Sequence, residues 1–403
     1  MTGARLRPLR LVPVLIGTVF LAVACASDAP QDTMQPQGPA ARQIDNLIMP
    51  VFAVAGVVFV VILGGALYVA LKFRARDDDD PEELPAQVHG NFKLEIGWTI
   101  VPATILAVVG AFTVVTIFDL AQEPDPDEAL HVEVYGQQWW WEYRYDLNND
   151  GNFDEITTAN DLVIPAGREV SLTIMSRDVI HSWWAPPLNG KKDAVPGRAH
   201  PLTIEADEPG EYIGQCTEFC GLSHAEMRIK VVAVGDEEFE EWTETQQRPF
   251  ENPTEDAEVA GWSAFAGQCT TCHQIDGMTD PASVGDPPAA TEIFEYPDEL
   301  DQVSGAAPNL TKFMSRSTFA GAKFDLRIDT PECEALGNFW AYTERGIEDC
   351  LNRNDLEAWL RNAPAEKEMA AGEVPNAMSR GMPNFNLTED QIDDLVAFLI
   401  TLK

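Results

Sequence analysis

The chain has 403 residues, 45% of them hydrophobic, and 27 Lys+Arg against 65 Asp+Glu give a formal net charge of −38. This length accommodates two or three folded units, and the composition suits soluble domains with a small membrane anchor rather than a many-helix membrane protein. A charge this negative argues against nucleic acid as a partner. It leaves two interpretations open: attraction to a basic protein or basic membrane-protein surface, and solubility of an exported protein, as in a salty habitat.

The first residues have the features of an export signal. Three arginines precede an apolar run that ends at residue 24 and is too short to span a bilayer. Residues 1–24 are therefore predicted to be a signal peptide. The sequence Leu-Ala-Val-Ala-Cys that ends at Cys25 resembles a bacterial lipobox, which implies cleavage and a lipidated cysteine. The alternative is an uncleaved first helix.

Two uncharged apolar stretches follow, at 46–71 and 96–118. Each exceeds the roughly 20 residues needed to cross a hydrocarbon core. The loop between them opens with basic residues, which favours the cytoplasmic side. Residues 46–120 are therefore predicted to form a transmembrane hairpin in a bacterial plasma membrane, with the soluble parts on the periplasmic or extracellular side. The alternative is a hairpin buried in a protein core.

Three segments with different patterns complete the chain. Short runs of alternating apolar and polar residues, separated by Gly and Pro, fill 124–235 and predict an antiparallel β-sandwich or barrel. The acidic stretch 236–257 predicts a linker. Residues 258–403 are predicted to be mostly helical, with a last helix that Thr388 caps together with Gln391.

One turn-rich loop brings together Cys216, Cys220, His224 and Met227. Soft sulfur ligands with imidazole select copper. A mononuclear copper site uses one cysteine, so two at this spacing indicate a dinuclear centre, which requires a second histidine. His181 supplies it from a separate loop. The alternatives are a structural zinc site, a disulfide, and a chance grouping of core residues; the metal selectivity of this ligand set argues against each.

The stretch from 46 to about 234 resembles subunit II of cytochrome c oxidase, and its copper loop matches that family at every ligand. The resemblance implies a cupredoxin-like sandwich that holds a dinuclear copper (CuA) centre. The implied ligands are Cys216 and Cys220 as bridging thiolates, His181 and His224 as terminal imidazoles, and Met227 and the carbonyl of Glu218 as axial ligands. The Glu218 side chain would also help to bind Mg²⁺ against the catalytic subunit.

Two further segments carry the resemblance. Gln-Trp-Trp-Trp-Glu-Tyr, from position 138, resembles the family strand whose first tryptophan receives the electrons, which corresponds to Trp139. Trp140 stands where the family commonly has tyrosine, and we interpret it as sheet packing. The sequence around Glu95 resembles the start of the second membrane helix, where a glutamate lies at the mouth of a proton-uptake channel. By itself, Glu95 is a carboxylate that favours a helix start.

Cys269-Thr-Thr-Cys272-His273 is a covalent haem attachment motif. The two thiols bond the haem edge, and the adjacent histidine then lies under the iron. A thioredoxin-like redox pair is the alternative, but it would need a βαβ setting and no following histidine. A class I cytochrome c, an all-α domain, is thus predicted at 258–403.

The resemblance to cytochromes c also assigns the other haem contacts. Met382, in Gly-Met-Pro, resembles the distal ligand, with Met378 as the second candidate because methionine more often fills cores. Pro308 lies in a segment like the loop whose proline carbonyl accepts the histidine N–H. Cys333 and Cys350 fall in an apparent insertion, 322–354, and are predicted to form a disulfide.

The chain has only six histidines, and neither membrane stretch contains one. An O₂-reducing haem–copper site needs several imidazoles at membrane depth, so it must lie on another subunit. The whole chain is similar to subunit II of caa-type oxidases. This implies electron transfer from haem c through CuA to the catalytic subunit I, which reduces O₂ to water with proton translocation.

The implied partners are subunit I, further oxidase subunits, and cytochrome c or quinol–cytochrome c reductase as electron donor. Two alternatives remain: a CuA-containing subunit of a nitric oxide or nitrous oxide reductase, and a copper storage or delivery module. The hairpin with Glu95 and the haem motif favour the oxidase over both.

Overall fold

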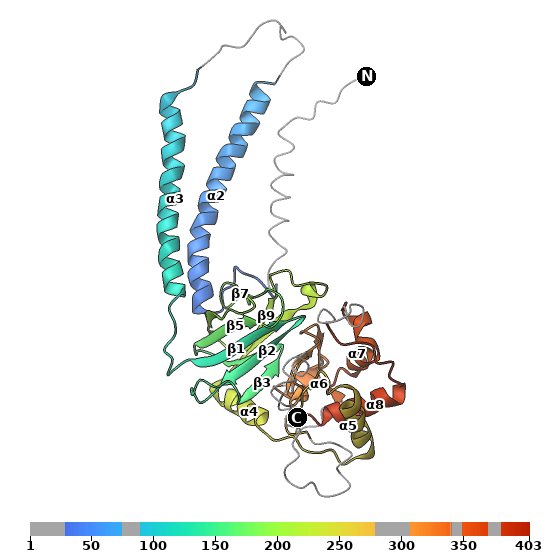
Figure 1. Cartoon of the computed structure of the whole chain (residues 1–403). Coiled ribbons are helices and arrows are strands. Elements are labelled where there is room, and N and C mark those ends of the chain that lie inside the picture. The colour runs from blue at the N-terminus through green and yellow to red at the C-terminus, as the bar shows by residue number, and fades with distance from the viewer. Residues whose placement is uncertain (1–28, 75–88, 279–306, 339, 341–348, 370–379) are drawn as a thin grey trace, which may run out of the picture.

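The computed structural model describes residues 29–74, 89–278, 307–338, 340, 349–369 and 380–403 (Figure 1). The predicted signal peptide, 1–24, and Cys25 lie outside these residues.

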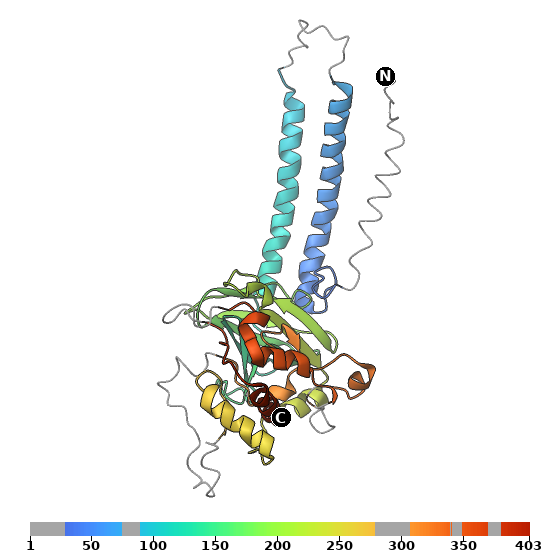
Figure 2. The same ribbon diagram turned by 90° about the vertical axis from the view of Figure 1, so that its right-hand side faces the viewer.

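Two long helices stand side by side and project from one end of the β-domain (Figures 1 and 2). They are α2 (Pro39–Lys72) and α3 (Phe92–Leu120), with mean hydropathies of 2.8 and 2.4 in their most apolar windows, none of which is buried inside the protein. Asn91 caps α3 by accepting hydrogen bonds from two backbone N–H groups. Both helices are long and apolar enough to cross a membrane, as the sequence predicts.

The first turn of α2 is attached to the β-domain. This helix begins earlier than the apolar stretch because Pro39 fits a first helical turn. The N–H of Ala41 donates to Leu188 O at 3.2 Å, and the N–H of Gln37 donates to Pro187 O at 2.8 Å. Arg42 forms a two-pronged ion pair with Asp207. The membrane helix and the β-domain are therefore joined by hydrogen bonds as well as by the chain.

The β-domain packs two main sheets with orders β3-β2-β1-β5-β8 and β4-β10-β9, beside a β6-β7 hairpin. The strands are β1 (Leu130–Gln137), β2 (Trp140–Asp146), β3 (Ile156–Ala159), β4 (Asp161–Pro165), β5 (Val170–Ser176), β6 (His181–Trp183), β7 (Lys192–Ala194), β8 (His200–Ile204), β9 (Gly210–Gln215) and β10 (Arg228–Val234). The predicted β-sandwich is confirmed, but it is not antiparallel throughout, because β1 pairs with β5, and β4 with β10, in parallel. Neither pair is consecutive in the chain, so hairpin turns do not constrain the strands to be antiparallel.

Alternation along the strands builds the core as predicted. In β1, Leu130, Val132 and Val134 are buried, whereas His131 and Glu133 between them are only half-buried. In β5 the buried residues again occupy every second position. Each such side chain contributes about 1.5–3 kcal/mol when it leaves water.

The predicted linker is helical over its first half. Helix α4 (Asp236–Gln246) begins with three acidic residues, which suit a helix N-terminus. Its Phe239 and Trp242 are buried, and the Trp242 ring lies 5.1 Å from that of Tyr145 in the sheet. The prediction missed this helix because its exposed acidic residues outnumber the apolar residues that pack on the sandwich.

The C-terminal part has its own core, built from α5 (Asp256–Gln268), α7 (Arg353–Glu366) and α8 (Glu389–Ile400). Helices α5 and α8 cross so closely that a Cβ on Gly261 would lie 1.9 Å from Asp394 O. Thr388 and Gln391 cap α8 as predicted. The part is not purely α-helical, since β11 (Thr318–Phe319) pairs with β12 (Phe324–Asp325).

A short helix, α6 (Pro331–Glu334), carries one half of a disulfide. Cys333 and Cys350 are bonded, with Cα atoms 5.7 Å apart, which confirms the predicted pairing.

Candidate metal centre and the adjoining cavity

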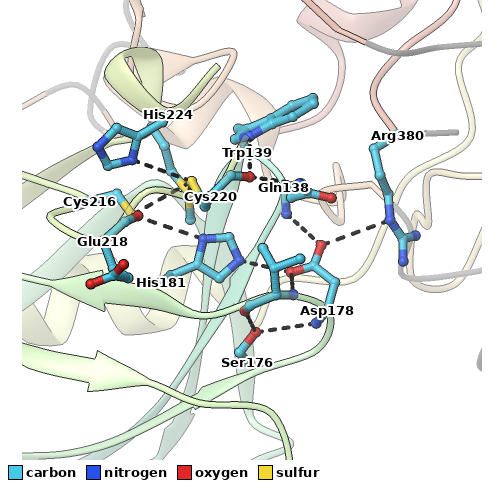
Figure 3. Close-up of polar contacts among 12 residues, drawn as sticks. Gln138, Trp139, Ser176, Asp178, His181, Cys216, Glu218, Cys220, His224 and Arg380 are labelled. Atoms are coloured by element: carbon cyan, nitrogen blue, oxygen red, sulfur yellow. Dashed lines mark hydrogen bonds and ion pairs between the residues drawn. The ribbon is translucent and has the colours of Figure 1, made fainter. Parts of the chain in front are cut away.

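The loop from β9 to β10 and strand β6 bring the predicted copper ligands together (Figure 3). The sulfur atoms of Cys216 and Cys220 are 3.8 Å apart. His181 Nδ1 lies 4.0 Å from Cys216 Sγ, and His224 Nδ1 lies 3.5 Å from Cys220 Sγ. Met227 Sδ is 3.8 Å from Cys220 Sγ. All five side chains of the predicted set thus converge.

The carbonyl oxygen of Glu218 completes the group at 3.3 Å from Cys216 Sγ. The Glu218 side chain is exposed on the outside of the loop, so it is free to face another molecule. Both properties are compatible with the two roles that the family resemblance implies for this residue, which stay predictions.

The two thiols are buried and compete for one proton. Their mutual hydrogen bond lowers the pKa of Cys216 to about 4 and raises the pKa of Cys220. Two soft sulfur donors at this spacing, with an imidazole on each side, fit a pair of copper ions, whose positive charge would allow both cysteines to be thiolates.

Asp178 orients one of the imidazoles. Its Oδ1 lies 2.8 Å from His181 Nε2, which directs Nδ1 toward the sulfurs (Figure 3). Burial raises the pKa of the Asp178 carboxyl, but hydrogen bonds from His181 and from the Gln138 N–H outweigh it and hold this pKa below its usual value. The carboxylate is therefore charged at neutral pH and supports the histidine from outside the metal group.

Trp139 lies directly against the metal loop. Its indole N–H donates to Cys220 O at 3.0 Å, and the Gln138 amide donates to the same oxygen at 2.6 Å. Gly221 permits this approach, because a Cβ there would lie 2.9 Å from Gln138 Nε2 and 3.2 Å from the indole. The indole is 4% exposed.

On its other side, Trp139 lines a cavity of about 210 Å³. The cavity lies between the β-domain and the C-terminal part. Its lining includes all of the predicted haem contacts, namely Cys269, Cys272, His273, Pro308 and Met382.

The predicted haem attachment motif follows helix α5, with Cys269 as the C-cap of that helix. His273 Nδ1 lies 2.8 Å from Pro308 O, the contact that the sequence predicts. Burial lowers the pKa of His273 to about 4, so the imidazole is neutral and its Nε2 has a lone pair for a metal. The cavity is mostly apolar, which suits a haem.

Two methionines of the described residues line the cavity. Met382 donates its backbone N–H to Met369 Sδ at 3.3 Å. Gly381 has φ +103, and a Cβ there would lie 2.3 Å from Met369 Sδ, so glycine is required where these two segments meet. The alternative ligand Met378 lies outside the described residues.

Sequence reasoning missed three residues near the site. Met369 is one, and Arg380 lines the same cavity while its Nε lies 3.9 Å from Asp178 Oδ2 (Figure 3). Lys367 is the third, and its Nζ donates to Trp139 O at 2.8 Å. No local sequence pattern identifies these residues, because their partners are far away in the chain.

Glu95 is remote from this group. It lies exposed in the first turn of α3, after the cap residue Asn91. Its position agrees with a helix-start carboxylate, and the described residues leave its predicted proton role untested.

Comparison with known proteins gives two family matches. Residues 29–115 match "Cytochrome C oxidase subunit II, transmembrane domain", and residues 130–234 match "Cytochrome C oxidase subunit II, periplasmic domain". The second match contains the whole metal group and Trp139.

Individual relatives extend over the full chain. Cytochrome c oxidase subunit 2 of Alkalihalophilus pseudofirmus is 31% identical over 401 residues, which cover 98% of this chain and 97% of that protein. The protein of the same name from Bacillus sp. (strain PS3) is 28% identical over 403 residues, 96% of each. Among solved structures, the periplasmic domain of subunit II of cytochrome oxidase of Bradyrhizobium japonicum is 29% identical and covers 31% of this chain and 97% of its own, with a TM-score of 0.28.

Proposed function

Because the chain belongs to the cytochrome c oxidase subunit 2 family, we propose that it is the subunit through which electrons enter a membrane-bound haem–copper oxidase. The chain is then one subunit of an oxidoreductase complex, and the O₂-reducing site lies on the catalytic subunit I. Cytochrome c or quinol–cytochrome c reductase supplies the electrons, and the complex translocates protons. The two apolar helices anchor it in a bacterial plasma membrane, with the metal group on the outer side.

The observation that carries this proposal is the position of Trp139. Its indole N–H bonds to the carbonyl of Cys220, and its ring lines the cavity that contains the CxxCH motif. One side chain therefore touches both the proposed metal loop and the proposed haem cavity. This supports Trp139 as the residue through which electrons reach the copper group.

Two cofactors supply the redox chemistry: a dinuclear copper centre and one covalent haem c, each of which accepts and releases one electron at a time. Cys216 and Cys220 would bridge the coppers, with His181, His224, Met227 and the Glu218 carbonyl as the remaining ligands. The 3.8 Å sulfur–sulfur distance supports this assignment. Asp178 holds His181 in the orientation that this requires.

The haem would be bonded by Cys269 and Cys272, with His273 as the proximal ligand. Pro308 O fixes this imidazole by accepting its Nδ1–H. Met382 is the proposed distal ligand. The apolar lining of the cavity would keep water away from a haem held by these residues, and a thioether ligand would favour the ferrous form.

Two carboxylates are assigned by family resemblance. Glu218 would contribute to a Mg²⁺ site at the contact with subunit I, which its exposure permits. Glu95 would lie at the mouth of a proton-uptake channel, where Glu95→Gln would slow turnover of the complex and leave the copper and haem spectra unchanged.

Purification of the chain from its native membrane tests the proposal. We expect a large histidine-containing membrane subunit to co-purify, two coppers and one covalent haem per chain, and O₂ uptake with reduced cytochrome c. A complex that reduces nitric oxide or nitrous oxide instead would identify the alternative reductase. A chain that purifies without copper and without haem would disprove the cofactor assignment.

A further inference from the structure

Lys367, at the end of α7, is 4% exposed. Its amino group donates hydrogen bonds to three backbone carbonyls: Trp139 O at 2.8 Å, Glu226 O at 3.1 Å and Ala320 O at 2.8 Å. The first two acceptors belong to the β-domain and the third to the C-terminal part. A single side chain thus links the peptide of Trp139, the end of the metal loop and the wall of the cavity.

Burial of a lysine in this way needs a specific reason, because lysine side chains are almost always exposed. An ammonium group has three donors, and here each has an acceptor. Burial lowers the pKa of Lys367 to about 7, whereas three carbonyl acceptors favour its charged form. The apolar stem fills space, but a Leu or Met would fill the same space and leave the three carbonyls without these donors.

The backbone beside Lys367 is shaped for this contact. Gly321 has φ +77, and a Cβ there would lie 2.4 Å from Lys367 Nζ and 2.5 Å from Trp139 O. Any larger residue would occupy the position where the amino group and the tryptophan carbonyl meet. The Gly321 carbonyl also accepts the Arg228 N–H at 3.0 Å, directly after the proposed ligand Met227.

We propose that Lys367 is a positioning residue for electron transfer: it holds the C-terminal domain in one docked position, with the haem cavity against Trp139. This inference rests on the proposed function. Lys367 also lines the cavity, but its amino group is bonded to backbone carbonyls, and we infer that it acts through the backbone of Trp139.

Other contacts across the same boundary agree with a built interface. The buried carboxylate of Asp161 accepts hydrogen bonds from the N–H groups and hydroxyls of Ser317 and Thr318, with Ser317 N at 2.6 Å. The Ser223 hydroxyl donates to Glu368 O, next to Lys367. Arg380 pairs with Asp178 on the far side of the cavity. Together with the hydrogen bonds of Lys367, these contacts connect the two domains at four separate places and so define one relative orientation.

The docked position has a consequence for the electron donor. Trp139 is 4% exposed, because the C-terminal domain covers it. A soluble donor therefore cannot touch the indole while the domains are docked. An electron that enters through the Trp139 indole must therefore come from the C-terminal domain.

The full complex with Lys367→Met tests the inference. After the haem is reduced by a light pulse, one electron should leave it and appear on the copper centre at least about tenfold more slowly than in the wild type, because the three hydrogen bonds that fix the docked position are lost. The rate of the slower transfer should also depend on solvent viscosity, because the two domains must then diffuse into contact before the electron can move. The copper and haem spectra should stay unchanged. Arg361→Met is the matched control, since it removes an exposed cation of the same helix that pairs with Glu389 inside the C-terminal domain.

Gly321→Ala provides a second variant that keeps the lysine but displaces its amino group, and it should slow the transfer in the same direction. Wild-type transfer rates in both variants would overturn the role of Lys367, even though the proposed function would stand. Failure of the wild-type complex to move an electron from haem to copper would instead disprove the proposed function. If Lys367→Met misfolds, Gly321→Ala decides the matter.

Discussion

The indole N–H of Trp139 donates a hydrogen bond to the carbonyl oxygen of Cys220 at 3.0 Å, and the same indole forms part of the wall of the neighbouring cavity. One residue thus separates a proposed copper thiolate from a proposed haem. Because this connection is so short, we expect the proposed copper group and the proposed haem to exchange electrons directly through Trp139.

Trp139→Phe should slow electron transfer from haem to copper and leave both spectra intact. Phenylalanine keeps much of the ring but loses the indole N–H, so the Cys220 carbonyl retains only the hydrogen bond from Gln138. We expect a loss of stability of about 1 kcal/mol from the missing hydrogen bond. Flash reduction of the haem, followed at copper wavelengths, measures the rate. Trp140→Phe serves as a control, and equal rates in the wild type and Trp139→Phe would contradict the prediction.

Cys220→Ser should abolish the mixed-valence copper spectrum and leave the haem bands unchanged. A hydroxyl is a poor ligand for copper compared with a thiolate, so the bridge between the ions is lost. Electron-spin resonance and copper analysis of the purified chain test this. Two coppers with an unaltered spin signature would show that the metal group is not built on Cys220.

Met382→Ala should convert a low-spin haem into a high-spin or water-ligated one and lower its reduction potential, because the thioether stabilises ferrous iron. Met369 also lines the cavity, so Met369→Ala is the essential comparison, together with Met378→Ala. We expect both of these variants to keep the low-spin spectrum. A high-spin haem in either of them, with a normal Met382→Ala protein, would reassign the ligand.

Acid should destabilise the chain before haem attachment. Burial lowers the pKa of His273 to about 4, whereas an unfolded histidine titrates near 6.5. Between these values the unfolded state binds the extra proton, so stability is complete above about pH 6.5 and falls as the pH drops toward 4, by up to about 3 kcal/mol. Denaturant unfolding of haem-free protein at several pH values measures this loss. His273→Asn should flatten the dependence, and an equally steep slope in that variant would assign the effect to other groups.

Much of this architecture follows from local sequence patterns. Hydropathy predicts the hairpin, alternation predicts the strands, and the spacing of Cys216, Cys220 and His224 predicts the metal loop, because each signal lies within a few residues. The pairing of Cys333 with Cys350 could be predicted because no other cysteines remained in that region.

Contacts between distant segments could not be predicted in this way. Lys367 and Trp139 are 228 positions apart, and nothing beside either residue indicates the other. The parallel pairing of β1 with β5 likewise depends on how the chain crosses the sandwich. Helix α4 was missed for a different reason. Its two aromatic residues pack on the sheet, but most of the other residues of the helix are charged or polar, so the sequence shows no clear apolar stripe at helical spacing.

The attachment of α2 to the β-domain also affects how the β-domain is oriented relative to the membrane surface. Hydrogen bonds from Ala41 and Gln37, and the ion pair of Arg42 with Asp207, bind the first helical turn to the sandwich. A flexible stalk would let the domain swing above the lipid surface, whereas these hydrogen bonds and this ion pair restrict that movement. The exposed face of the metal loop is thereby held in a constant orientation toward whatever lies beside the hairpin in the bilayer.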